Sequence, residues 1–493
     1  MASIFELISD QKTPPSYKFF SRGKWWQSKS GKLTEIISPV DSSILGRLQV
    51  VTKEEIDQAI GDACRGQKEW EKLAVDKRAK ILHLAADWVR EEEHFLSTLL
   101  VKEIGKTIDE AKSEVLRTAE MIDLFAQEVR TLRGETLESD LFPGFEKGKE
   151  AIIDRVARGV ILAIAPFNYP LNLSASKIAP ALVTGNACLL KPPTNGGISA
   201  LHLVRIFEKA GVPGGVLAAL TGSGSEIGDY LVTHSGIEMI SFTGSSQVGK
   251  SIAQKAGMIP LLFECGGNNP ALVLDNANLD LAALEIVKGA FSYSGQRCTA
   301  IKYLLATSET MDKLIPKLKK GVKEKVKMGD PRSPRTKMVG PLINLDAAME
   351  VENRIIKAKV NGAKILTGGK REGNYLEPTI LDNVKPTMEI VKVETFGPVL
   401  SLIRVKNINE AIEIVNASEY GLQASIFTQD EGTGIALARK IEVGTVQINS
   451  SPQRGPDHFP FLGVKASGVG VQGIRYTLEA MTRPKSVVLN KPE

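Results

Sequence analysis

Hydrophobic residues recur at helical spacing in the part of the chain that follows residue 50. In VTKEEIDQAIGDACRGQKEW the apolar side chains return every three or four residues, which is the period of one helix face. Thr52 and Glu55 stand three residues apart at its start and resemble a capping box. The pattern predicts helices from about 53 to 130, with an amphipathic helix over 108–130. Residues 131–150 are polar and rich in Gly and Glu, which indicates an exposed excursion.

The period then changes to that of buried strands. Five short apolar runs follow, each bounded by Gly or Pro: VILAIAP (160–166), ACLLKP (187–192), VLAALTG (216–222), EMISFTG (238–244) and LLFECGG (261–267). Helix-length segments separate them, so the pattern predicts βαβ units and a parallel sheet with helices on both faces. Ligands of such sheets bind beyond the carboxyl ends of the strands. Those ends carry PFNY, KPPT, GSGS, TGSS and ECGG.

A second α/β pattern begins near residue 271 and continues to about 448. The tail PKSVVLNKP (484–492) is typical of a single strand. A lone strand would leave an unpaired edge, so we expect it to pair with another chain or with another part of this one.

Composition narrows the classes of protein. The chain has 493 residues, 43% hydrophobic and 24% charged, with a net charge of +5. This balance argues against a nucleic-acid or membrane-surface protein but leaves room for a local basic pocket. We find neither an apolar run long enough to span a membrane nor a signal peptide, so we expect a cytoplasmic protein. The five histidines do not cluster, so we expect no zinc site.

The four cysteines are Cys64, Cys188, Cys265 and Cys298, without a CxxC pair, which is typical of reduced thiols. Cys298 lies in SGQRCTA, a polar, loop-forming context that suits an accessible thiol, and the adjacent Arg297 could favour its thiolate. A buried small hydrophobe is the alternative, and Cys64 and Cys188 fit it better.

Glu264 lies near the end of an apolar strand, where an unpaired carboxylate would cost several kcal/mol. It is either hydrogen-bonded for structure or raised in pKa for base chemistry. Strand alternation turns the neighbouring Cys265 to the opposite face, so the two should not act together. Asn168 could donate to an oxyanion or could serve as a turn residue before Pro170. Lys191 could contact a phosphate or ribose or could be a surface lysine.

The turn FTGSSQVG (242–249) leads into a helix and offers backbone donors to a phosphate. Together with PFNYP, KPPT, FECGGNNP, GQRCTA and ETFGPVL it resembles the aldehyde dehydrogenase superfamily over essentially the whole chain. RTAEMI around Arg117, KPPT and SSPQRGPDHFPF (450–461) are most similar to the non-phosphorylating glyceraldehyde-3-phosphate dehydrogenases. Two departures are Cys265, where Leu is commoner, and Ser450-Ser451, where Arg or Pro is more usual.

The resemblance implies a division of labour among catalytic residues. Cys298 would attack an aldehyde as thiolate, Asn168 and the Cys298 backbone N–H would hold the oxyanion, and Glu264 would activate water to hydrolyse the thioester. It implies NADP as cofactor, with NAD possible, because neutral Thr194 stands where NAD enzymes often carry Glu. The implied cofactor residues are Phe167, Lys191, Thr194, Gly224, Asp229, Gly244, Ser245, Glu394 and Phe396. The implied substrate residues are Arg117, Asn168, Tyr169, Arg297 and Arg454.

The fold implied is α/β and aldehyde dehydrogenase-like, with two doubly covered, mostly parallel sheets and a small β oligomerisation extension. The expected divisions are a cofactor domain (1–133 and 159–266), a catalytic domain (267–448), an arm returning to the cofactor domain (449–481) and an oligomerisation domain (134–158 and 482–493). A homo-oligomer, dimer or tetramer, is expected.

The implied reaction oxidises glyceraldehyde 3-phosphate to 3-phosphoglycerate without phosphorylation. The alternatives are another short aldehyde, such as succinate semialdehyde or lactaldehyde, a retired relative that only binds nucleotide, and a thiol hydrolase that turns over without nicotinamide.

Overall fold

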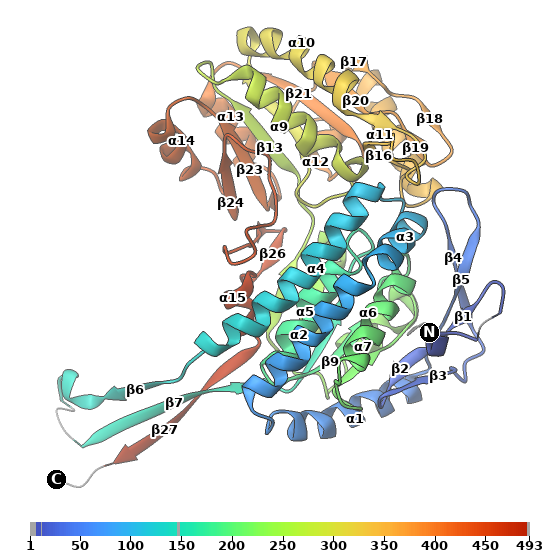
Figure 1. Ribbon diagram of the computed structural model, residues 1–493. Coiled ribbons are helices and arrows are strands. Elements are labelled where there is room, and N and C mark those ends of the chain that lie inside the picture. The colour runs from blue at the N-terminus through green and yellow to red at the C-terminus, as the bar shows by residue number, and fades with distance from the viewer. Residues whose placement is uncertain (1–5, 11, 145–147, 491–493) are drawn as a thin grey trace.

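The computed structural model of the protein describes residues 6–10, 12–144 and 148–490. Two lobes, each built around a large sheet, lie one above the other, and a narrow arm of strands projects from the lower lobe (Figure 1). The α/β class and the two mostly parallel sheets predicted from the sequence are confirmed.

The lower lobe contains an eight-stranded sheet in the order β26-β12-β11-β8-β9-β10-β2-β3. Its parallel centre is formed by the five predicted runs: β8 (Val160–Ile164), β9 (Ala187–Lys191), β10 (Leu217–Ala219), β11 (Met239–Thr243) and β12 (Leu261–Glu264). Antiparallel strands complete the edges: β2 (Phe19–Ser21), β3 (Lys24–Trp26) and β26 (Gly468–Val469). The strand order reverses at β8, so the crevice between the ends of β8 and β11 is where this topology places a ligand.

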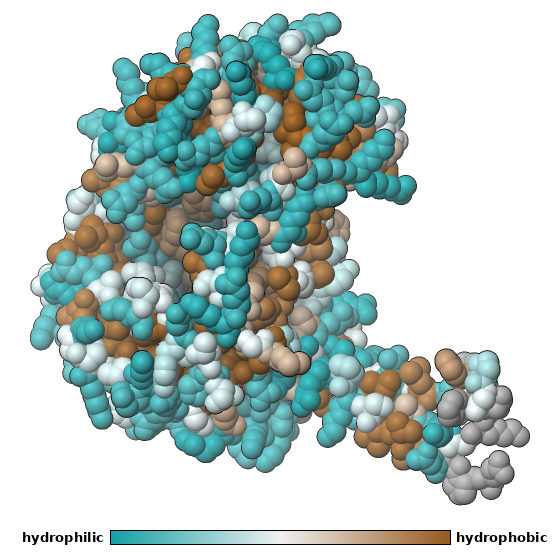
Figure 2. Space-filling model, turned by 180° about the vertical axis from the view of Figure 1, so that it is seen from behind, coloured by the Kyte–Doolittle hydropathy of each residue, from teal (hydrophilic) through white to brown (hydrophobic). Residues whose placement is uncertain are grey.

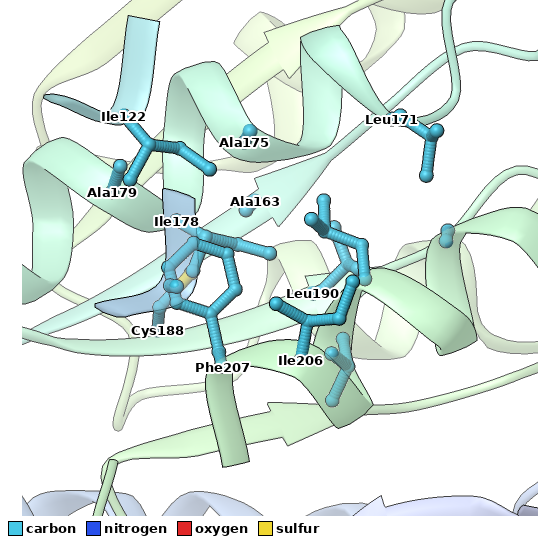
Figure 3. Close-up of a cluster of buried hydrophobic side chains, with 14 of the residues drawn as sticks. Ile122, Ala163, Leu171, Ala175, Ile178, Ala179, Cys188, Leu190, Ile206 and Phe207 are labelled. Carbon is cyan, nitrogen blue, oxygen red and sulfur yellow. The ribbon is translucent and has the colours of Figure 1, made fainter. Parts of the chain in front are cut away.

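Helices cover both faces of this sheet, as predicted. They are α1 (Lys53–Trp70), α2 (Val75–Glu91), α3 (Glu93–Ile104), α4 (Ile108–Glu128), α5 (Asn172–Val183), α6 (Gly197–Lys209), α7 (Asp229–Val232) and α8 (Ser246–Lys255). One core holds side chains of α2 to α6 and the other those of α1, α7 and α8. The Thr52–Glu55 capping box opens α1. Cys188 lies among Ile178, Leu190 and Phe207 in the first core, which confirms it as a buried small hydrophobe (Figure 3).

The upper lobe contains a seven-stranded sheet in the order β17-β20-β21-β14-β13-β23-β24, parallel except for the β17–β20 pair. The strands are β13 (Asn269–Val273), β14 (Ile301–Thr307), β17 (Lys364–Thr367), β20 (Thr379–Asp382), β21 (Val399–Val405), β23 (Gln423–Phe427) and β24 (Thr445–Ile448). The helices are α9 (Leu279–Phe291), α10 (Ser308–Lys325), α11 (Leu345–Val360), α12 (Glu389–Lys392), α13 (Ile408–Asn416) and α14 (Glu431–Ala438). Two separate cores lie on its two faces.

The projecting arm is a three-stranded antiparallel sheet. β27 (Thr482–Asn490) pairs with β7 (Lys149–Ala157) along its whole length, and β6 (Glu135–Glu138) pairs with the other edge of β7. The tail strand therefore finds its partner within its own chain. Side chains exposed on the arm include Leu137, Ile152, Val487, Val488 and Leu489, and Figure 2 shows apolar residues gathered on it. Residues 145–147 and 491–493 of the expected extension lie outside the described residues.

The described part of the first 50 residues forms further short strands. β4 (Leu33–Ile37) and β5 (Ile44–Gln49) make a hairpin to which β1 (Ser16–Tyr17) adds. The other small elements are β15 (Lys327–Met328), β16 (Met338–Val339), β18 (Arg371–Glu372), β19 (Tyr375–Leu376), β22 (Tyr420–Gly421), β25 (Val464–Lys465) and α15 (Ile474–Ala480). Over the described ranges, none of the helices combines the length and apolarity needed to cross a membrane.

A core substitution tests the central sheet. Leu162 on β8 is 0% exposed, whereas Leu284 on α9 is 49% exposed. Leu162→Ala should lower the free energy of unfolding by about 2–5 kcal/mol because it leaves a cavity, and Leu284→Ala by less than about 0.5 kcal/mol. Urea unfolding followed by circular dichroism measures both. Equal midpoints for the two variants would contradict the placement of β8 in the core.

Candidate active site

A cavity of about 390 Å³ opens at the carboxyl ends of β8 and β11, where the strand order reverses. Its walls include seven of the residues implied from the sequence: Phe167, Asn168, Gly244, Ser245, Cys298, Glu394 and Phe396. They come from both lobes, since residues up to 245 follow strands of the lower sheet and Cys298 precedes β14 of the upper one. The cavity therefore lies where the two lobes meet.

The loop that carries Cys298 begins with unusual backbone. Tyr293 and Ser294 have φ values of 50° and 52°, in the left-handed region that non-glycine residues rarely adopt. Gly295 follows at φ 67°, and a Cβ there would lie 2.2 Å from the Gly397 carbonyl oxygen. Strain of this kind persists only where the surroundings impose it. The half-buried Cys298 side chain reaches the cavity wall.

The Cys298 thiol meets the Glu264 carboxylate. Sγ lies 3.4 Å from Oε1 of Glu264, the last residue of β12. The other oxygen, Oε2, accepts a hydrogen bond of 2.8 Å from Nη1 of Arg454, whose Nη2 donates to Gln472. Glu264 is 3% exposed, so its charge is buried but paired. The ion pair with Arg454 explains how a carboxylate can be buried at the end of an apolar strand.

Cys265 also borders the cavity, and its side chain contacts α8. A Cβ on Gly249 of α8 would lie 2.6 Å from its Sγ, so the thiol packs against that helix. Burial raises the pKa of this thiol to about 12.

The pKa of the Cys298 thiol is raised well above its usual value. Burial is the main cause, and the Glu264 and Glu394 carboxylates add to it, while Arg454 opposes it. Arg297, the neighbour expected to favour the thiolate, donates through Nη2 to the Gly289 carbonyl, 2.8 Å away. Arg454 is a cation that favours the thiolate.

Asn168 faces the same loop from the lower lobe. It follows β8, is 4% exposed, and its Nδ2 donates to the Gln296 carbonyl at 3.1 Å. An amide nitrogen carries two N–H groups, so one is committed to positioning and the second can serve an oxygen in the cavity. The neighbouring Phe167 ring meets Phe396 edge-on at 5.9 Å.

Glu394 accepts a hydrogen bond from the segment that joins the two sheets. Its Oε1 accepts the Gly267 N–H at 3.1 Å, and burial raises its pKa to about 7 although Lys302 opposes the shift. Lys302, which sequence reasoning missed, donates through Nζ to the Gly295 carbonyl at 2.7 Å. Burial lowers the pKa of Lys302 to about 8.

The predicted Gly-Ser turn leads into α8, as expected. Ser245 is its N-cap and accepts the Val248 N–H at 3.3 Å, and the Gly244 N–H donates to the Glu264 carbonyl at 3.1 Å. Those groups hold the turn itself. The first N–H groups of a helix have no partners within the helix, so the start of α8 offers donors at the cavity.

Four of the implied cofactor residues lie outside this cavity. Lys191 is not a surface lysine: it is 7% exposed, donates to the Pro192 carbonyl at 3.1 Å, and burial lowers its pKa to about 8. Thr194 is half-buried in the loop before α6. Gly224 begins the turn Gly224–Gly228, and Asp229 opens α7 with its carboxylate bonded to Lys255 of α8 at 2.7 and 2.8 Å. Asp229 thus braces two helices instead of presenting a free carboxylate.

A second cavity, of about 220 Å³, contains three of the expected substrate residues, Arg117, Tyr169 and Arg297. Its wall also carries Asp109, Glu110, Ser113, Glu114, Asn172, Ser292 and Tyr293. Arg117 donates to the Arg454 carbonyl at 2.9 Å, but the Arg454 guanidinium is committed to Glu264. The three arginines are therefore close in the fold. Arg117 and Arg297 line the second cavity, and Arg454 pairs with the Glu264 carboxylate.

Lys177 is a buried residue that the sequence reading overlooked. It is 1% exposed on α5, donates to the Thr243 hydroxyl at 2.7 Å, and its pKa is lowered to about 7 by burial although the nearby Glu264 opposes the shift. A single lysine inside the apolar stretch SASKIAPALV was the available signal. Among the residues that the structure covers, no group of three or more His, Cys, Asp and Glu side chains could hold a metal ion.

Comparison with known proteins gives matches over nearly the whole chain. The model of the Aldehyde dehydrogenase family matches residues 25–487. An NADP-dependent glyceraldehyde-3-phosphate dehydrogenase of Streptococcus equinus is 46% identical over 474 residues, 96% of this chain and 98% of that protein. One of Pisum sativum is 45% identical over 478 residues, 97% of this chain and 96% of that protein. The crystal structure of the Bacillus halodurans C-125 enzyme complexed with NADP superposes with a TM-score of 0.94 at 46% identity, covering 96% and 99% of the two chains.

The raised pKa of Cys298 gives a test without substrate. Alkylation of Cys298 by iodoacetamide should accelerate with pH up to pH 9 without a plateau, because the thiolate fraction keeps rising below the pKa. Glu264→Gln removes a charge that raises this pKa, so alkylation at pH 8 should be faster than in the wild type. Mass spectrometry of the Cys298 peptide measures the rate, and the buried Cys188 provides an internal reference. A plateau below pH 7 would mean that the thiol already ionises in the resting protein.

Proposed function

Because the chain belongs to the aldehyde dehydrogenase family, we propose that it oxidises glyceraldehyde 3-phosphate to 3-phosphoglycerate with NADP, without phosphorylation. The observation that carries the proposal is the contact of the Cys298 thiol with the Glu264 carboxylate beside a cavity that also contains Asn168. A nucleophile, a base and an amide donor are the groups that oxidation of an aldehyde through an acyl-enzyme requires. A thiol hydrolase of the papain kind would need a histidine base, and here the base beside the thiol is a carboxylate.

The residues act in sequence. Cys298 gives its proton to solvent water and its sulfur bonds to the aldehyde carbon, while the second N–H of Asn168 stabilises the oxygen that becomes negative. Loss of a hydride, which is a proton with two electrons, from that carbon leaves a thioester on Cys298. Glu264 then takes a proton from water, whose oxygen attacks the thioester and releases the acid and the thiol. The Arg454–Glu264 ion pair keeps the carboxylate oriented for this step.

The residues at the first cavity fit the nicotinamide half of NADP. The start of α8 would hold the pyrophosphate, and Glu394 and Phe396 would hold the ribose and ring. A Cβ at Gly266 would lie 2.4 Å from Glu394 Oε2, so glycine there leaves room for the carboxylate. The nicotinamide, when bound, accepts the hydrogen and electrons of the aldehyde carbon. NADP is favoured over NAD because Thr194 presents no negative charge to a 2′-phosphate and because the relatives are named NADP-dependent.

The second cavity supports a phosphorylated aldehyde. Arg117 and Arg297 place two guanidinium groups on one small wall, and their planar forks match phosphate oxygens. Tyr169 adds a hydroxyl next to Asn168. A carboxylate tail could use the same groups, so succinate semialdehyde is the competing substrate.

The proposal extends to the cellular setting and assembly. We place the enzyme in the cytoplasm, in glycolytic oxidation of glyceraldehyde 3-phosphate, as a dimer or tetramer. The support for assembly is the projecting arm, whose edge strand β27 carries exposed Val487, Val488 and Leu489. The expected oligomerisation divisions, 134–158 and 482–493, include the three strands of this arm, β6, β7 and β27.

The base role predicts a burst. Glu264→Gln should release about one equivalent of NADPH per Cys298 and then turn over at least about 100-fold more slowly than the wild type, because the thioester forms but water is not activated. Stopped-flow absorbance at 340 nm measures the burst. Cys298→Ala, as control, should show neither burst nor turnover while still binding NADP. A folded Glu264→Gln protein without a burst would assign Glu264 to an earlier step.

The phosphate pocket predicts a substrate-specific loss. Arg117→Ala should raise KM for glyceraldehyde 3-phosphate by roughly 10- to 100-fold, the effect of one lost charge-assisted hydrogen bond. Kinetics with unphosphorylated glyceraldehyde should hardly change. The matched control is Arg130→Ala, just beyond α4, where the guanidinium pairs with Asp76 on the surface. A parallel loss on both aldehydes would show that Arg117 is structural.

A further inference from the structure

A fully buried lysine lies beside the second cavity. The Lys106 side chain, just before α4, is 0% exposed, and its ammonium group pairs with the equally buried Glu114 carboxylate. Figure 1 shows α4 running from the boundary between the lobes toward the arm, and Lys106 lies just before the first residue of this helix. A buried ion pair is weak evidence for stability, because well-packed apolar residues often serve as well. Stability alone therefore does not explain why this ion pair is buried here.

Two aromatic rings surround the ammonium group. Nζ of Lys106 lies 3.4 Å from the ring centroid of Tyr169 and 4.6 Å from that of Tyr293. The rings meet each other edge-on, with centroids 6.0 Å apart and planes at 74°. A cation over an aromatic face attracts it most strongly when both are removed from water, as they are here.

The two tyrosines belong to the two segments that carry the chemistry. Tyr169 directly follows Asn168, and Tyr293 opens the left-handed stretch that leads to Cys298. The segments also meet through the hydrogen bond from Asn168 to the Gln296 carbonyl.

Carboxylates beside Lys106 hold the backbones of both segments. Glu114 Oε1 accepts the N–H groups of Leu171 and Asn172 at 3.0 and 3.2 Å. Glu110 Oε1 accepts the Tyr293 N–H at 2.6 Å. The start of α4 therefore fixes both segments, and the charge of Lys106 compensates the carboxylates that do so.

We infer that Lys106 is a positioning residue: clamped by Glu114 and by the rings of Tyr169 and Tyr293, it fixes the Asn168 segment against the Cys298 loop. The inference rests on the proposed function, because the geometry it protects is that of an amide donor and a nucleophile on one carbonyl. A displacement of about 1 Å in such an arrangement can cost about 100-fold in rate. Binding of the cofactor at the start of α8 does not involve this clamp.

The test is the double variant Lys106→Met/Glu114→Gln. It removes both buried charges together, and Gln keeps an acceptor for the N–H groups of Leu171 and Asn172. The unfolding temperature should stay close to that of the wild type, KM for NADP should be unchanged, and kcat should fall about tenfold because the rings lose their cation. Arg78→Met, which removes another buried cation that donates to backbone carbonyls far from the site, should lower the unfolding temperature and leave kcat unchanged.

A second pair of variants keeps the ion pair and changes one ring. On unphosphorylated glyceraldehyde, Tyr169→Leu should have a kcat about tenfold lower than Tyr169→Phe, because only Phe keeps the ring over the ammonium group. Three results would each overturn the inference. The first is a wild-type kcat in the double variant, and the second is an equal kcat for Phe and Leu at position 169. The third is a rise in KM for NADP that parallels the loss of kcat.

One measurement separates this inference from the proposed function. Iodoacetamide alkylation of Cys298 needs no substrate and should be faster in the double variant, because the loop is less restrained. An unchanged rate would overturn the clamp whatever the substrate is. If the wild type prefers another aldehyde, the proposed substrate fails, and the kcat comparison is made on that aldehyde.

Discussion

A buried carboxylate needs a partner, and at Glu264 that requirement organises the site. A charge removed from water at the end of an apolar strand would cost several kcal/mol without compensation. Arg454 supplies the compensation from 190 residues further along the chain. The same returning segment adds β26 to the sheet beside β12, with Glu264 paired to Gly468 in register. The ion pair and the strand pairing together fix the carboxylate oxygen that meets Cys298.

The site is assembled from both lobes, and polar contacts hold them in register around it. Asn168 of the lower lobe donates to Gln296 of the upper one, and Glu394 accepts the Gly267 N–H where the chain passes from β12 to β13. Catalytic geometry therefore depends on how the lobes meet, not on either sheet alone. This explains why so many buried charges, including Lys302 and Lys106, lie at that boundary: each neutralises a carboxylate or binds a carbonyl that positions a loop.

Local patterns in the sequence predicted the strands and helices well, because these elements form from interactions between residues that are close in the sequence. Short apolar runs bounded by Gly and Pro became β8 to β12, and the Thr52–Glu55 spacing became a capping box. Residues at strand ends, such as Asn168 and Ser245, could be placed at the cavity because parallel strands gather their carboxyl ends at one edge.

Such patterns could not predict ion pairs between residues that are far apart in the sequence. No local rule connects Arg454 with Glu264, and none indicates that Arg454 favours the Cys298 thiolate. The left-handed backbone conformation of Tyr293 and Ser294 could not be predicted from the sequence either, because neither residue type favours that conformation. The alternatives left open at Glu264 and Lys191 depended on burial and partners, which only the folded chain supplies.

The most direct test of the account is the initial rate of reduced-cofactor formation by the wild type on a panel of aldehydes without inorganic phosphate. The panel is glyceraldehyde 3-phosphate, succinate semialdehyde and lactaldehyde, each with NADP and with NAD. We expect the highest kcat/KM for glyceraldehyde 3-phosphate with NADP, and 3-phosphoglycerate as the product. A requirement for inorganic phosphate, or a higher kcat/KM on succinate semialdehyde, would contradict it.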